Sequence, residues 1–399
     1  MRLKSSRCLK IEKYQLFFLL SLWLLVHIFL FSTFGVRDYF VDSRRYFEMS
    51  DYFLTHGNFE FFHHIFYSFP VLLLLLFRLL FSDAGVAFVF FQAVFSGVAT
   101  LALYRSASLV FRNCHAGFFA AVIFLLWIDC IQWNTAVMTE SVASSLICLV
   151  IYQLTHYRDA LSAHITLVVL VALSLLTRPT GVLVCLGVAT FLLTRYWNAF
   201  KKPSTKFLVI GVLGAVACFC AFFMLNQWDF TDQYEKGNIV TYMDTIEGQL
   251  HYHDNLRLET SELILSDLEK PPFEKLVFFV FHNPVHFVQA GTLKVFYLVS
   301  GFRPYFSTLH NLYTIVWVSF AYFLFYAGYR CVQDKPVRNF CLALVIGNCL
   351  LISVSAVDWD NRFFLPMQPG IVLLAGGGAA HFLRKVGTRV RCLPQFRED

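Results

Sequence analysis

Long apolar stretches, separated by short polar or basic connectors, fill most of this chain. The stretches are residues 16–34, 69–81, 84–104, 116–133, 142–154, 165–176, 182–196, 207–225, 284–300, 312–329, 340–357 and 365–383. Most of them approach the length of about 20 apolar residues that crosses a bilayer core. Helices are expected, because an open strand would leave unpaired backbone groups in lipid. The pattern therefore predicts an all-α integral membrane protein, a polytopic helical bundle of about 10–12 spans.

Two longer polar segments interrupt this pattern, at residues 36–66 and 227–283. The sequence contains no tandem repeat, heptad run or low-complexity linker, so we expect residues 1–399 to form a single multi-pass membrane domain. Lysine and arginine cluster before residue 14, at 195–206, at 330–338 and after 383, which predicts that these segments are cytoplasmic. Residues 36–66 then form a first outer loop with interfacial helices, and residues 227–283 form a second outer loop.

The number of apolar stretches conflicts with this orientation. An odd number of them separates Lys13 from Arg195, although both residues should be cytoplasmic. Either the short stretch 69–81, which carries Arg78, does not cross fully, or another short stretch is re-entrant. Residues 284–300, which contain Lys294, raise the same conflict, and we expect them to form an amphipathic helix on the outer interface.

The composition also indicates a membrane protein. Hydrophobic residues make up 58% of the chain and charged residues 15%, whereas about a quarter of a soluble domain is charged. The net charge of +6 comes from residues at the ends of apolar stretches and does not indicate nucleic-acid binding. The 11 cysteines lie mostly within apolar stretches, where a thiol behaves as a small hydrophobic group, and no CxxC pair predicts a zinc or redox site.

The first outer loop contains many ionisable side chains for so apolar a chain: Arg37, Asp38, Asp42, Arg44, Arg45, Glu48, Asp51, His56, Glu60, His63 and His64. From Asp42 onward, Tyr46, Met49 and Phe53 recur at helical spacing, and Gly57 supplies a stop. An amphipathic helix on the membrane surface is predicted, with Asp42 at its N-terminal end. The alternative is that Asp42 serves only as a helix cap, which aspartate often does.

Three polar breaks between apolar stretches carry further candidates. Glu140 lies in Met-Thr-Glu-Ser (138–141); a carboxylate at membrane depth is costly unless it is paired or faces water, and otherwise it only opens the next helix. Arg178 lies in Leu-Thr-Arg-Pro-Thr-Gly (176–181), where it can hold a phosphate by forked hydrogen bonds or extend to the interface. Arg362 lies in Asn-Arg-Phe-Phe-Leu-Pro (361–366), where it can offset phosphate charge or pair with Asp358 or Asp360.

Histidines raise the question of a metal. His251 and His253 occupy alternate positions in the second polar segment and Asp254 follows directly, so a divalent metal is possible, although such residues are more often solvated. The adjacent His63 and His64 would diverge on a helix. We therefore assign no metal ligands, and neither a glycine-rich phosphate loop nor a Gly-x-Ser-x-Gly elbow occurs in the sequence.

In their order and spacing these features resemble the GT-C superfamily of polytopic glycosyltransferases. The branch that they resemble most contains the protein mannosyltransferases and the lipid A aminoarabinose transferases. The resemblance rests on the Asp-x-x-x-Tyr loop from Asp42 to Tyr46, on the breaks at Glu140 and Arg178, and on the Asn-Arg-Phe-Phe-Leu-Pro motif before the last span. It extends over nearly the whole chain, but the chain ends shortly after that last span, whereas family members often continue.

The resemblance implies a sugar donor linked to polyprenyl or dolichyl phosphate, and transfer with inversion to a hydroxyl of a glycan, lipid or protein on the periplasmic or lumenal side. Asp42 then acts as the general base, which a hydroxyl nucleophile requires within hydrogen-bond reach. The other residues fall into three groups. Asp51 and Glu140 are further catalytic candidates; Arg362, Arg178 and Arg45 are candidates for binding the donor phosphate; Asp38, Tyr46, Glu48 and His64 are candidates for binding substrate. The membrane would be the bacterial inner membrane or the endoplasmic reticulum.

Two other functional classes fit the apolar pattern. A transporter or lipid flippase should show inverted repeats with broken helices near the midplane, and the breaks at Glu140 and Arg178 fit this loosely, but the sequence shows no repeat. A glycan polymerase or ligase would also use lipid-linked sugars, but typically places its large outer loop late in the chain. If the transferase prediction holds, Asp42, Glu140, Arg178 and Arg362 should meet around one cavity.

Overall fold

The computed structural model describes residues 6–38, 42–158, 160–197, 226, 229–241, 256–266 and 269–391. Helices dominate this part of the chain, where the only β pairing consists of isolated bridges. The helices are α1 (Ser6–Phe34), α2 (Ser43–His56), η1 (Phe62–Tyr67), α3 (Ser68–Leu80), α4 (Ala84–Val110), α5 (Cys114–Leu126), α6 (Ile128–Ile131), η2 (Gln132–Thr135), α7 (Thr139–Thr155), α8 (Leu161–Leu175), η3 (Pro179–Gly181), α9 (Val182–Tyr196), α11 (Thr231–Glu235), α13 (Pro272–His282), α14 (Pro284–Ser300), α15 (Thr308–Cys331), α16 (Lys335–Val354), η5 (Arg362–Phe364) and α17 (Gln368–Arg391). The predicted all-α fold class is confirmed.

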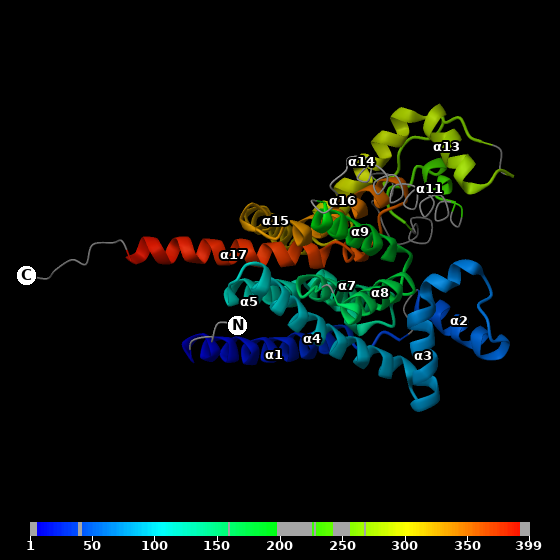
Figure 1. Ribbon diagram of the computed structural model, residues 1–399. Helices are drawn as coiled ribbons and strands as arrows, with labels where there is room; N and C mark the ends of the chain where they lie inside the picture. The colour runs from blue at the N-terminus through cyan, green and yellow to red at the C-terminus, as the bar shows by residue number, and fades with distance from the viewer. Residues whose placement is uncertain are drawn as a thin grey trace, which may run out of the picture.

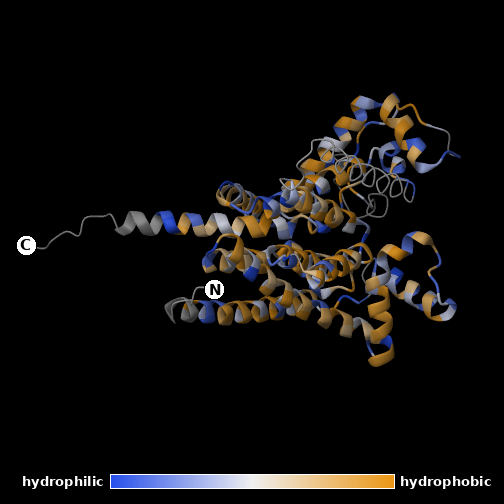
Figure 2. Cartoon of the chain, viewed as in Figure 1, coloured by the Kyte–Doolittle hydropathy of each residue, from blue (hydrophilic) through white to orange (hydrophobic). Residues whose placement is uncertain are grey.

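Six of the described segments are long and apolar enough to cross a membrane: Ile11–Phe34, Phe62–Leu80, Ala84–Val110, Pro179–Tyr196, Thr308–Cys331 and Lys335–Val354. A seventh is added if the pair Cys114–Leu126 and Ile128–Thr135, bent by 66°, counts as one broken span. The predicted stretches 142–154 and 165–176 coincide with the shorter apolar helices α7 and α8, and 207–225 lies outside the described residues. Figure 2 shows hydrophobic residues along α1 and α4, many of them exposed as expected of a lipid-facing surface.

Helix α17 lies between α15 and α5, with which it makes its most extensive contacts (Figure 1). The sequence allows this because α17 carries three consecutive glycines. A Cβ added to Gly376 would overlap the backbone of α5 at Ala116, and one added to Gly378 would overlap the backbone of α15 at Leu324. Small residues therefore bring these helices together.

The predicted loop 36–66 contains α2 and η1, and α3 follows directly. Tyr46 and Met49 face inward from α2 and are buried, and Gly57 ends the helix in a left-handed conformation (φ +73°), as the sequence predicts. Helix α3 runs across the direction of α1 and α17 (Figure 1), although its length and composition alone would allow a span. This direction favours the prediction that residues 69–81 do not cross the membrane fully.

Candidate functional site

Asp42 lies at the start of α2, at the N-cap position. Its side chain forms no capping hydrogen bond with the first turn of α2, all of which the structure describes. Instead, Arg362 Nη1 donates to Asp42 Oδ2 at 2.5 Å, and Arg45 Nη2 lies 3.9 Å from Asp42 Oδ1. The alternative role as a simple helix cap is therefore not what this side chain does. Arg362 holds it across 320 positions of sequence.

Glu140 lies in the first turn of α7, where the chain leaves the broken segment formed by α5, α6 and η2. The residue is only 1% exposed. Its Oε1 forms an ion pair with Arg178 Nη1 and lies 3.7 Å from Arg362 Nη1. Burial alone would lower the pKa of Arg178, but the Glu140 carboxylate raises it above its ordinary value. Arg178 therefore remains charged, and Pro179, which begins η3, fixes the break from which it extends.

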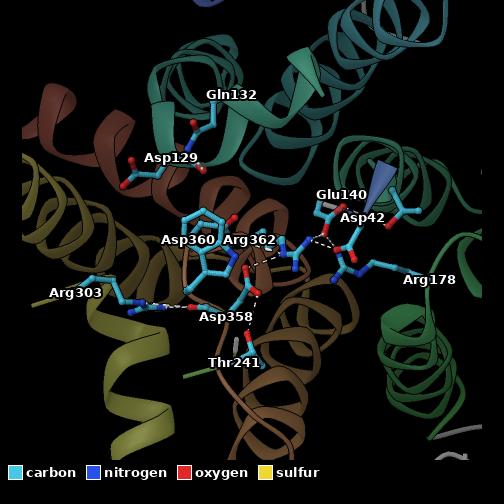
Figure 3. A network of polar contacts seen from close by, with 12 residues as sticks. Asp42, Asp129, Gln132, Glu140, Arg178, Thr241, Arg303, Asp358, Asp360 and Arg362 are labelled. Carbon is cyan, nitrogen blue, oxygen red and sulfur yellow. Dashed lines mark hydrogen bonds and ion pairs between the residues drawn. The ribbon is translucent and has the colours of Figure 1, made fainter. Parts of the chain in front are cut away.

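Arg362 is the centre of the network drawn in Figure 3. Its side chain is 4% exposed, and its Nε lies 2.7 Å from Asp358 Oδ2 and 3.7 Å from Asp360 Oδ1. Asn361, immediately before it, adopts a left-handed conformation (φ +67°) that turns the chain at this point. Burial alone would lower the pKa of Arg362, but Asp358 and Glu140 raise it, so the guanidinium stays charged.

The two aspartates beside Arg362 differ in their protonation. Burial alone would raise the pKa of Asp358, but Arg362 and a hydrogen bond from Asp360 lower it below its ordinary value. Burial and the negative charge of Asp358 raise the pKa of Asp360 well above its ordinary value. Of the two, Asp360 therefore holds a proton more readily, and Asp358 is the better ionised partner for Arg362.

Contacts from Arg303 and Thr241 hold Asp358 in place. Arg303 is fully buried, and its Nη2 donates to the main-chain oxygen of Asp358 at 2.7 Å (Figure 3). The same guanidinium donates to the main-chain oxygen of Tyr297 at 2.7 Å. Thr241 Oγ1 donates to Asp358 Oδ1 at 3.2 Å. These hydrogen bonds connect Asp358, in the loop before η5, to α14 and to the segment that ends at Thr241.

These groups surround one cavity of about 530 Å³, which we call the main cavity. Its lining consists of Asp42, Arg45, Tyr46, Tyr67, Glu140, Arg178, Pro179, Thr180, Asp229, Phe230, Gln233, Asn238, Thr241, Leu351, Ile352, Ser355, Ala356, Arg362 and Phe363. The structure therefore brings together Asp42, Glu140, Arg178 and Arg362, the four residues expected to converge. Arg45 and Tyr46, also named from the sequence, line the same cavity.

The other predicted site residues lie elsewhere. Asp51 is 56% exposed on its side chain and pairs with Arg78 of α3 at 2.5 Å. Glu48 pairs with Arg44 at 2.8 Å, and together with His64 it lines a separate hollow of about 360 Å³ that shares only Arg45 with the main cavity. Asp38 packs with its Cβ against Gly85 at the start of α4 and is not among the residues that line either space.

The sequence alone did not indicate Arg303, Thr241 or the wall formed by residues 229–238. It named Asp358 and Asp360 only as alternative partners of Arg362. Two acids within four positions of an arginine, in a turn before an apolar span, are a usable signal for such a network. Arg303 follows α14 and Gly301, and only its complete burial reveals its role.

The described residues do not include the three side chains considered as metal ligands. His251, His253 and Asp254 lie outside them. Among the residues that the structure does describe, no three histidine, cysteine, aspartate or glutamate side chains are arranged to hold a metal ion. A divalent metal stays a possibility predicted from the sequence.

Comparisons with known proteins found similarities among solved structures and to one family model. Among solved structures, the crystal structure of the Archaeoglobus fulgidus oligosaccharyltransferase tethered with an acceptor peptide matches with 13% identity and a TM-score of 0.49, covering 94% of this chain and 50% of that one. The archaeal oligosaccharyltransferase AglB from the same organism, in complex with an inhibitory peptide and a dolichol-phosphate, matches with 12% identity and a TM-score of 0.48, covering 96% and 52%. This chain thus spans about half the length of these proteins.

A search of curated protein sequences found no significant match. Residues 69–224 match the model of the family described as dolichyl-phosphate-mannose-protein mannosyltransferase. The matched range contains Glu140 and Arg178, whereas Asp42 lies before it and Arg362 after it. Over residues 69–224 the chain carries the sequence pattern of the dolichyl-phosphate-mannose-protein mannosyltransferase family, which confirms the resemblance predicted from its motifs.

Proposed function

We propose that this protein is a glycosyltransferase that moves a sugar from a polyprenyl- or dolichyl-phosphate donor to a hydroxyl group of a glycan, lipid or protein. One observation carries the proposal: Asp42 and three arginines line a single cavity that also has apolar walls. A carboxylate can accept the proton of an attacking alcohol. Cations stabilise the phosphate that leaves, and the apolar side chains of Leu351 and Ile352 suit a lipid tail.

The proposed reaction is a displacement at the anomeric carbon. The acceptor oxygen forms the new bond to this carbon on the face opposite the phosphate, and the carbon–oxygen bond to phosphate breaks with its electron pair going to the phosphate. Because the attack comes from the face opposite the leaving phosphate, the configuration inverts, and the acceptor proton passes to Asp42. Arg362 acts here as a positioning residue, because its contact with Asp42 and its low exposure suit it to orient the base.

Arg45 is the best candidate for the first contact with the donor phosphate. Its side chain is 45% exposed and its guanidinium lies over the rings of Tyr46 and Tyr67. Arg178, which lines the same cavity, can add a second forked contact. Arg362 can contact the donor phosphate only if one of the carboxylates that bind it, Asp42 or Asp358, releases it. The hollow beside Arg45 that contains Glu48 and His64 is the nearest place for an acceptor.

The helix order supports an active site on the periplasmic or lumenal side. If α3 does not cross the membrane, six helices (α1, α4, α5, α7, α8 and α9) separate Lys13 from Arg195. An even number returns the chain to its starting side and removes the conflict found in the sequence. The basic N-terminal segment and the end of α9 then lie on one side, which the distribution of lysine and arginine assigns to the cytoplasm, and Asp42 lies on the other.

The test is sugar transfer by the purified full-length protein in lipid nanodiscs, from synthetic prenyl-phospho-sugars to a panel of hydroxyl acceptors. Asp42→Asn keeps the shape of the side chain and removes the base, so transfer is expected to fall by about 10²–10⁴-fold. Asp51→Asn is the matched control, because Asp51 lies on the same helix outside the cavity, and it should retain activity. Transfer that persists in Asp42→Asn would overturn the assignment of the base, and movement of intact lipid without a new glycosidic bond would favour a flippase.

A further inference from the structure

A second pocket lies at the opposite end of the helices from the main cavity, where the basic connectors gather. We call it the basic-end pocket; it has a volume of about 310 Å³ and is lined by Val110, Phe111, Arg112, Asn113, Cys331, Gln333, Gly377, Ala380, His381 and Arg384. These residues come from the turn between α4 and α5, from the end of α15 and from α17. Nothing in the proposed transfer reaction requires a pocket at this end.

Close helix packing makes the floor of this pocket well defined. A Cβ added to Gly377 would overlap the ring of Phe111, so the α4–α5 turn lies directly against α17. On the other side, a Cβ added to Gly328 would overlap the backbone of α17 at Leu374, so α15 is in equally close contact. The side chains above this floor are therefore carried by three helices that cannot move apart without losing these contacts.

The charge of the pocket has one sign. Arg112 and Arg384 line it together with His381, and none of its lining residues in the described part of the chain is an aspartate or glutamate. The nearest acid in the sequence, Asp334, accepts a hydrogen bond from the Val337 amide at 3.1 Å and so caps α16. An anion in this pocket would meet arginines and amides but no carboxylate.

The backbone at Arg112 is unusual. Arg112 has a φ of +51°, one of only two positive values among non-glycine residues in the described ranges; the other belongs to Asn361, beside Arg362. A left-handed arginine costs about 1 kcal/mol or more, and such strain is concentrated at functional sites. The following residue, Asn113, accepts a hydrogen bond from the His115 amide at 3.0 Å and caps α5. The N-terminus of this 13-residue helix, with its positive end, thus begins at the pocket.

We propose that the basic-end pocket binds the phosphate of an anionic membrane lipid. Arginines form paired hydrogen bonds with phosphate, and basic pockets between membrane helices on the cytoplasmic side are suited to anionic headgroups. A lipid is favoured over free phosphate because exposed apolar side chains, Leu109 and Leu383, flank the pocket in the sequence of α4 and α17 and offer a surface to acyl chains. The site is independent of the proposed transferase activity.

The experiment uses the purified full-length protein in a mild nonionic detergent, with a fluorescent phosphatidylglycerol as the probe. Binding is compared for the wild type, for Arg112→Gln/Arg384→Gln, and for the control Arg330→Gln/Lys335→Gln. The control removes two cations, at the end of α15 and the start of α16, that do not line the pocket. We expect affinity to fall by about tenfold or more in the pocket variant, because two charge-assisted contacts are lost, and to change little in the control. The pocket arginines are exposed, so unchanged thermal unfolding without lipid should show that the variant folds.

Three outcomes would overturn the proposal. Equal losses in the two double variants would mean that the lipid responds only to the general basic surface. Equal binding of phosphatidylcholine would mean that the headgroup charge is not recognised. Full displacement of the probe by millimolar inorganic phosphate, with no dependence on acyl chains, would assign the pocket to a soluble phosphate and not to a lipid.

Discussion

The buried ion pair between Glu140 and Arg178 gives the sharpest prediction about this structure. Glu140→Gln preserves the shape of the side chain and removes its charge. Because breaking one partner of a buried pair leaves an uncompensated charge, we expect the free energy of unfolding to fall by about 3–5 kcal/mol. The expectation rests on burial: Glu140 is 1% exposed and Arg178 is also mostly buried.

Of the two arginines near Glu140, Arg178 should be the one that loses its ion-pair partner in Glu140→Gln. Arg362 keeps Asp42 at 2.5 Å and Asp358 at 2.7 Å, so the substitution removes only a more distant contact at 3.7 Å. Glu140 is the only carboxylate within ion-pair distance of Arg178 among the described residues. The double variant Glu140→Gln/Arg178→Met removes the stranded charge as well, and should therefore recover most of the lost stability.

The assay is equilibrium unfolding in mixed micelles of nonionic detergent and sodium dodecyl sulfate, followed by tryptophan fluorescence. Glu48→Gln is the matched control, since its pair with Arg44 is largely exposed and should contribute less than about 1 kcal/mol. A loss below about 1 kcal/mol in Glu140→Gln would refute the reasoning. So would a double variant that is as unstable as the single one, because the damage would then not come from an unpaired arginine.

Three further predictions concern other parts of the chain. Burial lowers the pKa of Lys294 to about 7 from 10.5; the unfolded chain then binds more protons between these values, so thermal stability should rise from about pH 7 to pH 9 in the wild type and stay level in Lys294→Met. Arg45→Gln should raise the KM for the lipid-phosphate sugar about tenfold in the transfer assay, whereas the exposed Arg44→Gln should not. Gly377→Leu should lower the apparent unfolding temperature strongly, because its side chain would overlap Phe111.

Helix boundaries were well predicted where capping signals are local. Residues 284–300 form α14 with the predicted bounds, since Pro284 opens the helix and Gly301 ends it in a left-handed conformation. Gly57 ends α2 for the same reason. The direction of α3 could not be predicted, because its apolar composition suits both a span and a surface helix, and only its contacts with α2 and α4 decide.

The sequence also could not decide which aspartate of the first outer loop, Asp42 or Asp51, faces the main cavity. Asp42 and Asp51 are nine positions apart, about two and a half turns of a helix, so they point to opposite sides. Sequence can state this relation, but it cannot state which side faces the cavity. That choice is made by Arg362, a residue far away in the chain whose contact with Asp42 the motif does not reveal.

The balance of charge in the main cavity links these observations to the proposed chemistry. With Asp360, whose pKa is raised, as the protonated member of its pair, three carboxylates, of Asp42, Glu140 and Asp358, face three arginines, at 45, 178 and 362. A prenyl-phospho-sugar brings one negative charge, and its cleavage leaves a phosphate monoester that can carry a second. If the acceptor proton passes to Asp42, the loss of that carboxylate charge offsets the charge gained by the phosphate. The same proton transfer weakens the hold of Asp42 on Arg362 Nη1, so this nitrogen can contact the departing phosphate while Asp358 still holds Nε. The ion pair that orients the base is thus also the arrangement that can deliver an arginine to the leaving group.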